Sequence, residues 1–326
     1  MNAFCTLCAT LSLAILFLGT AAGALLSNSA AWLAWRFAKR DRLLRFPELL
    51  FFGRVFPVAF GAVVTLGFAL PSFLLLEPHH SVEAPEPYLI VLAVLALAGM
   101  VVVVTRCARL FLLSRRTGRE WLGSAELLPI SASIPVYQLP NPDSLVAVVG
   151  IRHPKVFVGQ AALASLTMDE LKAVLAHELA HVDSFDNLKQ LVLRITNVPR
   201  FLVSLSKMDQ VWSAGAELLA DANALKSGTS VLELSSAIVK VGRLKSVPSA
   251  TLAVAACHLV PPDGSSSALA MRIQHLHNAL NTHSSQTPQD MKNSWRMTLL
   301  AGSFAYLLIL PRALPVVHRW MEWLAR

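Results

Sequence analysis

The chain has 326 residues, of which 55% are hydrophobic and only 15% are charged. This balance lies far from that of soluble proteins and predicts a membrane protein. The net charge of +8 would also suit a nucleic-acid-binding protein, but the sequence contains no nucleic-acid-binding motif, so we expect no direct binding of nucleic acid.

Four apolar runs are long enough to cross a bilayer as helices. They lie at Phe4 to Leu26, Val55 to Leu76, Pro87 to Thr105 and Met297 to Val317. The first run also carries the small residues typical of a signal-peptide cleavage site. We favour a retained span, because no basic region precedes the run and a second span follows it.

Basic residues in the loops predict the orientation. Lys and Arg are frequent between Arg36 and Arg54 and between Arg106 and Arg119, whereas Glu77 to Glu86 contains neither. The excess of positive charge on the cytoplasmic side therefore places both termini outside. We expect three spans in residues 1–113, a cytoplasmic domain in 114–296, and a fourth span with a short tail in 297–326.

The expected cytoplasmic domain begins with strands and continues with helices. Val136 to Leu139, Leu145 to Val149 and Lys155 to Val158 read as short strands, the first two separated by a turn at Pro140 to Asp143. After residue 160 the pattern is helical almost throughout. The fold class is thus a helical multi-span membrane protein with an α+β domain. The strand at Leu145 to Val149 is either ordinary sheet core or a site where a substrate adds as a further strand.

The most informative motif is His177-Glu178-Leu179-Ala180-His181. Thr167 and Glu170 form a capping box that predicts the start of its helix. Residues four apart share a helix face, so both imidazoles can reach one metal ion. Glu178 beside them can accept a proton from a metal-activated water.

Catalytic zinc usually takes three protein ligands, and Glu217 is the candidate for the third. We expect it on a helix from Ser213 to Gly228. Asp221 lies one turn later and can fix the tautomer of a zinc-binding His from behind. The alternative is two surface carboxylates on an amphipathic helix, but the upstream His pair favours the zinc site.

Together, His177 to His181, then Asp186-Asn187, then Glu217 to Asp221, resemble the BlaR/MecR-type membrane zinc peptidases. Leu145 to Val158 also resembles the strand pair before the zinc helix of that family. The resemblance implies a gluzincin-type zinc peptidase domain on the cytoplasmic side of a bacterial inner membrane. More distant prenyl-protein and heat-shock membrane peptidases share the Glu-x-x-x-Asp pattern.

The resemblance implies a regulatory cut in a cytoplasmic repressor. No penicillin-binding sensor domain follows the last run in this sequence, so antibiotic sensing by this chain is not expected. The signal would come from the membrane, from a partner such as a separate sensor protein, or from the loop Glu77 to Glu86. The alternatives are a quality-control protease for membrane proteins, a non-catalytic receptor or scaffold, and a transporter with a coincidental motif.

The expected chemistry is hydrolysis of a peptide bond with Zn²⁺ as cofactor. Zinc held by His177, His181 and Glu217 activates water, and Glu178 carries its proton to the leaving amine. Related enzymes often add a second oxyanion donor, for which Tyr137, His153 and His258 are candidates that the sequence does not separate.

Overall fold

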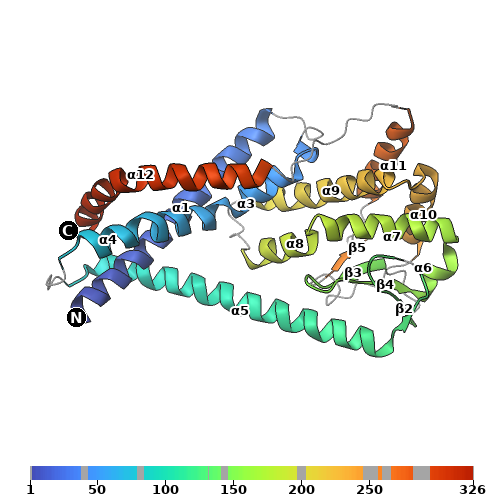
Figure 1. Ribbon diagram of the computed structural model, residues 1–326, viewed down its shortest axis with the longest axis horizontal. Helices are drawn as coiled ribbons and strands as arrows, with labels where there is room; N and C mark the ends of the chain where they lie inside the picture. The colour runs from blue at the N-terminus through green and yellow to red at the C-terminus, as the bar shows by residue number, and fades with distance from the viewer. Residues whose placement is uncertain are drawn as a thin grey trace. The chain divides into compact units, whose positions relative to one another are not determined.

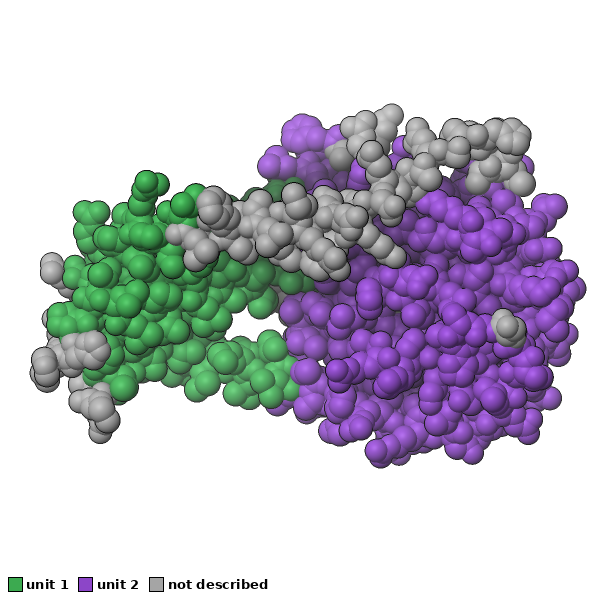
Figure 2. All heavy atoms as spheres, in the orientation of Figure 1, with its two compact units in different colours: residues 1–32, 53–104, 284–326 green, residues 33–52, 105–283 purple. Residues whose placement is uncertain are grey.

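The computed structural model describes residues 2–37, 43–78, 84–130, 132–140, 146–196, 203–244, 256–258, 266–281 and 294–325. Figure 2 shows its two compact units, each built from separate segments of the chain. Unit 1 comprises residues 1–32, 53–104 and 284–326, and unit 2 comprises residues 33–52 and 105–283. The predicted regions 1–113, 114–296 and 297–326 remain a prediction, because these units divide the chain differently.

Unit 1 is built from long apolar helices (Figure 1). They belong to α1 (Asn2–Phe37), α3 (Pro47–Ala62), η1 (Val63–Ala69), α4 (Leu70–Leu76), α5 (Pro87–Ser124) and α12 (Ser294–Ala325). η1 is a π-helical stretch that joins α3 and α4 into one rod. The Tyr306 hydroxyl of α12 donates a hydrogen bond of 2.7 Å to the carbonyl of Gly67 within η1.

Glycines let α1 approach α3 closely. A Cβ added at Gly19 would lie 3.0 Å from the Cα of Gly61, and one added at Gly23 would lie 2.9 Å from the Cα of Pro57. Both distances are too short for a side chain to fit without a shift of backbone. Small residues at such crossings are typical of helices that pack within a membrane.

Among the residues that the structure describes, three helices are long and apolar enough to cross a membrane, which suggests a membrane protein. They are Phe4–Phe37, Pro47–Leu76 and Pro87–Ser124, and they contain the first three predicted runs. Most of their apolar side chains face outward rather than into a core, as a lipid environment requires. The fourth run, Met297–Val317, lies inside α12. Among the described residues, α12 does not meet the combined criterion of length and hydropathy that the other three helices meet. The fourth span therefore remains a prediction.

Unit 2 contains a five-stranded sheet with the order β1-β2-β4-β3-β5. The strands are β1 (Glu126–Leu127), β2 (Val136–Leu139), β3 (Val146–Val149), β4 (Lys155–Gly159) and β5 (Ala256–His258). β2 and β4 are parallel and all other neighbours are antiparallel. The three predicted strands are present, although Leu145 and the predicted turn at 141–143 lie outside the described residues.

Within the described residues, further helices follow the start of the sheet in unit 2. They are α6 (Gln160–Ser165), α7 (Met168–Asp183), α8 (Asp186–Ile195), α9 (Val203–Lys226), α10 (Val231–Arg243) and α11 (Ser266–Asn281). The predicted start of α9 at Ser213 is wrong by ten residues. Ser favours the first position of a helix because its hydroxyl can cap free N–H groups, but Ser213 lies in the interior of α9.

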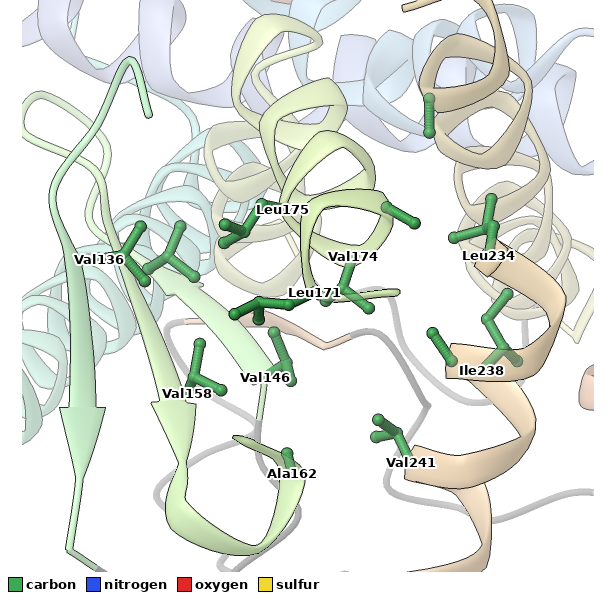
Figure 3. Close-up of a cluster of buried hydrophobic side chains, with 14 of the residues drawn as sticks. Val136, Val146, Val158, Ala162, Leu171, Val174, Leu175, Leu234, Ile238 and Val241 are labelled. Atoms are coloured by element: carbon green, nitrogen blue, oxygen red, sulfur yellow. The ribbon is translucent and has the colours of Figure 1, made fainter. Parts of the chain in front are cut away.

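The core of unit 2 places α7 between the sheet and α10 (Figure 3). Leu171 and Val174 of α7 pack against one face of the sheet, which presents Val136, Val146, Val148, Val156 and Val158. Leu234 and Ile238 of α10 complete the same cluster. The helix that carries the His-Glu-x-x-His motif is therefore fixed by apolar packing on both flanks.

Glu170 anchors the first turn of α7. It completes the predicted capping box with Thr167 and also accepts hydrogen bonds from Ser236 Oγ at 2.6 Å and Lys240 Nζ at 2.7 Å. Burial alone would raise the pKa of Glu170, but the bonds from Lys240, Ser236 and the Thr167 backbone lower it to about 2. The Glu170 carboxylate thus connects α10 to α7, the helix that carries the His-Glu-x-x-His motif.

We expect Glu170→Gln to reduce stability at neutral pH by about 1–3 kcal/mol, the usual worth of a hydrogen bond to a charged group. A carboxylate whose pKa is depressed by folding stabilises the protein above its ordinary pKa of 4.5, and this contribution disappears as the pH falls toward 2. Thermal unfolding between pH 7 and pH 2 should therefore show a flatter acid dependence in the variant. Asp169→Asn, at an exposed neighbouring position paired with Lys172, is the control. An unchanged acid dependence in Glu170→Gln would contradict this role.

Candidate metal site

Helices α7 and α9 bring together the three predicted metal ligands. Nε2 of His177 lies 3.2 Å from Nε2 of His181. The two oxygens of Glu217 lie 3.4 Å from His177 Nε2 and 3.6 Å from His181 Nε2. Within the described part of the chain, this is the group of three whose ligand atoms converge, all within 4.8 Å of one another.

The outer nitrogen of each imidazole faces a carboxylate. Nδ1 of His181 donates a hydrogen bond of 2.7 Å to Asp186. Nδ1 of His177 lies 2.9 Å from Asp221, an ion-pair contact rather than a well-directed hydrogen bond. A carboxylate behind an imidazole keeps the proton on that side and leaves the other nitrogen free for a metal. Asp221 stands where the sequence predicted, and Asp186 adds the equivalent partner for the second His.

These residues fit a zinc ion. The Nε2 atoms of the two imidazoles lie 3.2 Å apart beside the Glu217 carboxylate, so a cation, either a proton or a metal ion, is needed between them. A tetrahedral zinc about 2.0–2.1 Å from each nitrogen separates its donors by roughly 3.3 Å. Both carboxylate oxygens of Glu178 are also buried without a hydrogen-bond partner among the described residues. Such a group is expected to have a ligand or a reacting molecule as its partner.

The site shifts the pKa values of its own groups. Burial raises the pKa of Glu178 to about 7, although the two histidines act in the opposite direction. A carboxylate with that pKa can both accept and return a proton near neutral pH. Burial lowers the pKa of His177, but Asp221 and Glu217 raise it to about 9. A metal ion at this site therefore has to displace a proton from the imidazole.

Arg272 of α11 is a member of the site that the sequence analysis missed. Its side chain is buried and binds both oxygens of Asp221, with Nη2 at 2.6 Å and Nε at 2.8 Å. Nη1 lies 3.0 Å from Glu217. Burial would raise the pKa values of both carboxyl groups, but the guanidinium keeps them below their ordinary values. Arg272 thus keeps the carboxyl groups of Glu217 and Asp221 ionised.

A signal for Arg272 was present in the sequence. The residue shares a helix face with Leu269, three positions earlier, and Leu276, four positions later, and Leu276 is buried in the core. An arginine on the apolar stripe of a helix needs a buried acidic partner. By contrast, His275 and His277 on the same helix are exposed.

The structure does not bring Tyr137 or His153 to the metal site. Tyr137 stacks on Phe157 with ring centroids 5.6 Å apart, in a cluster with Trp121 on the sheet face opposite α7. His153 is exposed in the turn between β3 and β4. The backbone of His258 lies in β5, and its side chain is not among those described.

β5 was not predicted, and it changes the expected role of β3. The antiparallel pairing of Ala147 with His258 and of Val149 with Ala256 occupies the second edge of β3, whose first edge pairs with β4. The hypothesis that a substrate adds directly to β3 is therefore wrong for this arrangement of the sheet. A strand of three residues is too short to show the alternating pattern that reveals longer strands.

The region that contains this whole site has a recognisable family pattern. Residues 135–283 match peptidase family M48. The match supports a zinc metallopeptidase family and implies metallopeptidase activity. It does not confirm the more specific BlaR/MecR type, which remains a prediction. No curated protein matches the chain.

We expect Glu217→Ala to abolish high-affinity zinc binding, because it removes a ligand, and Asp221→Asn to weaken binding by about 10–100-fold, because it disturbs a ligand from behind. Competition with a chromophoric chelator would measure both. Glu233→Ala, at the start of the neighbouring helix α10, is the control. Parent-like binding by Glu217→Ala would place the third ligand elsewhere.

We expect Arg272→Met to destabilise the metal-free protein by about 3–5 kcal/mol, because buried carboxylates lose their counter-charge. Added zinc supplies positive charge at the same place, so it should raise the melting temperature more in this variant than in the parent. Thermal unfolding with and without zinc measures the difference. Arg243→Met, at an exposed position on α10, should behave like the parent, and an equal zinc effect in all three proteins would contradict the role of Arg272.

Proposed function

We propose that the chain is a membrane-bound, zinc-dependent endopeptidase. The observation that supports this most directly is the convergence of His177, His181 and Glu217 beside the buried, unpartnered carboxylate of Glu178. The match of the surrounding region to a peptidase family and the helices suited to a membrane point the same way.

The chemistry follows from the positions of the side chains. Zinc held by His177, His181 and Glu217 would supply Lewis-acid activation of the water and of the peptide carbonyl. Glu178 accepts the proton of the attacking water and passes it to the leaving amine, because its buried carboxylate lies beside the ligands without a hydrogen-bond partner among the described residues. Asp221 keeps the imidazole of His177 in the tautomer that binds metal.

The arrangement favours an active enzyme over a scaffold that has kept only the fold. A degenerate site loses members or their geometry, whereas here the buried Glu178 remains beside three convergent ligands. Arg272 also neutralises Asp221 and Glu217 at distances of 2.6–3.0 Å. Burying such a group of charges is costly for the fold, and its retention is best explained by catalysis. The same geometry disfavours a transporter with a coincidental motif.

For the substrate, we propose a protein at the cytoplasmic face of the membrane. The positive-inside pattern supports a cytoplasmic peptidase domain, and a domain joined to membrane helices reaches only proteins near the bilayer. The resemblance to BlaR/MecR-type peptidases favours a regulatory cut in a repressor. Broad removal of damaged membrane proteins is the competing function.

We expect Glu178→Gln to keep zinc but lose proteolysis, because the ligands remain while the proton acceptor is gone. Zinc content by mass spectrometry and cleavage of co-expressed substrate would be measured on the same preparations. Glu233→Gln is the matched control. Undiminished cleavage by Glu178→Gln would contradict the assignment of Glu178 as the proton acceptor.

The same variant identifies the substrate class. Proteins that accumulate in cells carrying Glu178→Gln instead of the parent chain are uncleaved substrates, and quantitative proteomics would reveal them. Accumulation of one repressor supports signalling. Accumulation of many membrane proteins instead supports quality control and excludes a dedicated regulatory cut.

Reporter fusions would test the orientation. We expect fusions after Gly118 and after Arg326 to report opposite sides of the membrane, because the fourth predicted run separates them. A reporter pair that is active only in the cytoplasm or only outside it distinguishes the two positions. The same side for both fusions would overturn the four-span arrangement.

A further inference from the structure

The hydrogen bond that orients His181 continues into a longer chain of charged groups. Oδ2 of Asp186 accepts a hydrogen bond of 2.7 Å from Nδ1 of His181. The other oxygen of Asp186 lies 3.5 Å from Nζ of Lys189. Lys189 also donates a hydrogen bond to Glu48, which lies in the first turn of α3. Lys189 and Asp186 are only 15% and 6% exposed, so water screens their contact weakly, whereas Glu48 is 38% exposed and its contact with Lys189 is screened more.

The same part of α3 also contacts the helix that carries Glu217. A Cβ added at Gly215 of α9 would lie 2.9 Å from the carbonyl oxygen of Leu44 and 3.2 Å from Cβ of Pro47. Phe51 and Trp212 have ring centroids 6.4 Å apart. We name residues 44–52 the coupling segment. It contacts Lys189, which lies next to the Asp186 carboxylate behind His181, and it also contacts α9, the helix that carries Glu217.

The coupling segment leads into a helix that is suited to a membrane, and its residues 47–52 form the first turns of that helix. Pro47 starts the rod Pro47–Leu76, which is long and apolar enough to cross a membrane. The segment itself belongs to the same compact unit as the metal site. Leu44 and Leu50 are buried, so the segment is held by packing as well as by the Glu48 contact.

We propose that Lys189 and Glu48 are positioning residues that set the orientation of His181, and that the coupling segment thereby links a membrane helix to metal affinity. With Glu48 engaged, the ammonium group of Lys189 is held 3.5 Å from Oδ1 of Asp186, where it orients this carboxylate while Oδ2 stays with His181. Without Glu48, Lys189 competes with His181 for Asp186. The inference rests on the proposed zinc site and adds a route by which the membrane part regulates it.

The first test measures metal binding by the full-length protein in detergent. We expect Lys189→Met to lower zinc affinity about tenfold, the lower end of the effect of groups that orient a metal-binding His, and Glu48→Gln to lower it less. The absorption spectrum of bound cobalt(II) should shift, since it reports ligand geometry. Lys189→Arg should stay close to the parent, and Lys172→Met, which breaks an exposed ion pair on α7 itself, is the control.

Exchange of the two charges separates positioning from simple tethering. Glu48→Lys combined with Lys189→Glu rebuilds an ion pair between the two positions but places a carboxylate against Asp186. If Lys189 positions Asp186, zinc affinity stays low in the double variant. Restored affinity would show that the pair only ties the coupling segment down, and would overturn the proposal.

A backbone variant tests the second contact without altering any charge. Gly215→Ala should push the coupling segment away from α9, lowering zinc affinity and shifting the cobalt spectrum. Gly123→Ala in α5 adds a methyl group with nothing within 4 Å and should have no effect. Parent-like zinc affinity and cobalt spectra in Gly215→Ala, Lys189→Met and Glu48→Gln would overturn the coupling while leaving the peptidase intact. A parent protein that binds no zinc would contradict the proposed function itself.

Discussion

The candidate site depends on a balance of buried charge. Four carboxylates, from Glu178, Asp186, Glu217 and Asp221, lie in or directly behind the site, and each is at most 9% exposed. The fixed cations beside them are Arg272, which contacts two of the carboxylates, and Lys189, which contacts a third. The carboxylates outnumber these cations, and the missing positive charge is supplied by a proton on His177, whose pKa Asp221 and Glu217 raise, or by a metal ion that displaces that proton. Binding of such an ion would therefore stabilise the fold of this region.

The local parts of this arrangement were predictable from sequence because they repeat with the period of a helix. The capping box at Thr167 defines the start of α7, and four-residue spacing places His177 and His181 on one face. The need of catalytic zinc for a third ligand then selected Glu217. In each case the information lies within one or two helical turns.

The remaining parts join residues that are distant in the sequence. Arg272 binds Asp221 across 51 positions, and Lys189 binds Glu48 across 141. Helical periodicity describes which face a residue occupies, but it does not name the partner on another element. β5 was missed for a similar reason, because its identity comes from pairing with β3 rather than from its own three residues.

The π-helical stretch η1 also affects where the length of the helix Pro47–Leu76 can change between related proteins. Each residue of an α-helix turns about 100° around the axis, and a π-helical turn holds an additional residue. Loss of one residue between Val63 and Ala69 would convert the wide turn into an ordinary one and leave both ends of the rod with their present faces. The same loss within Pro47–Ala62 would rotate one end against the other by about 100°. Related chains should therefore differ in length at η1 more readily than elsewhere in the rod.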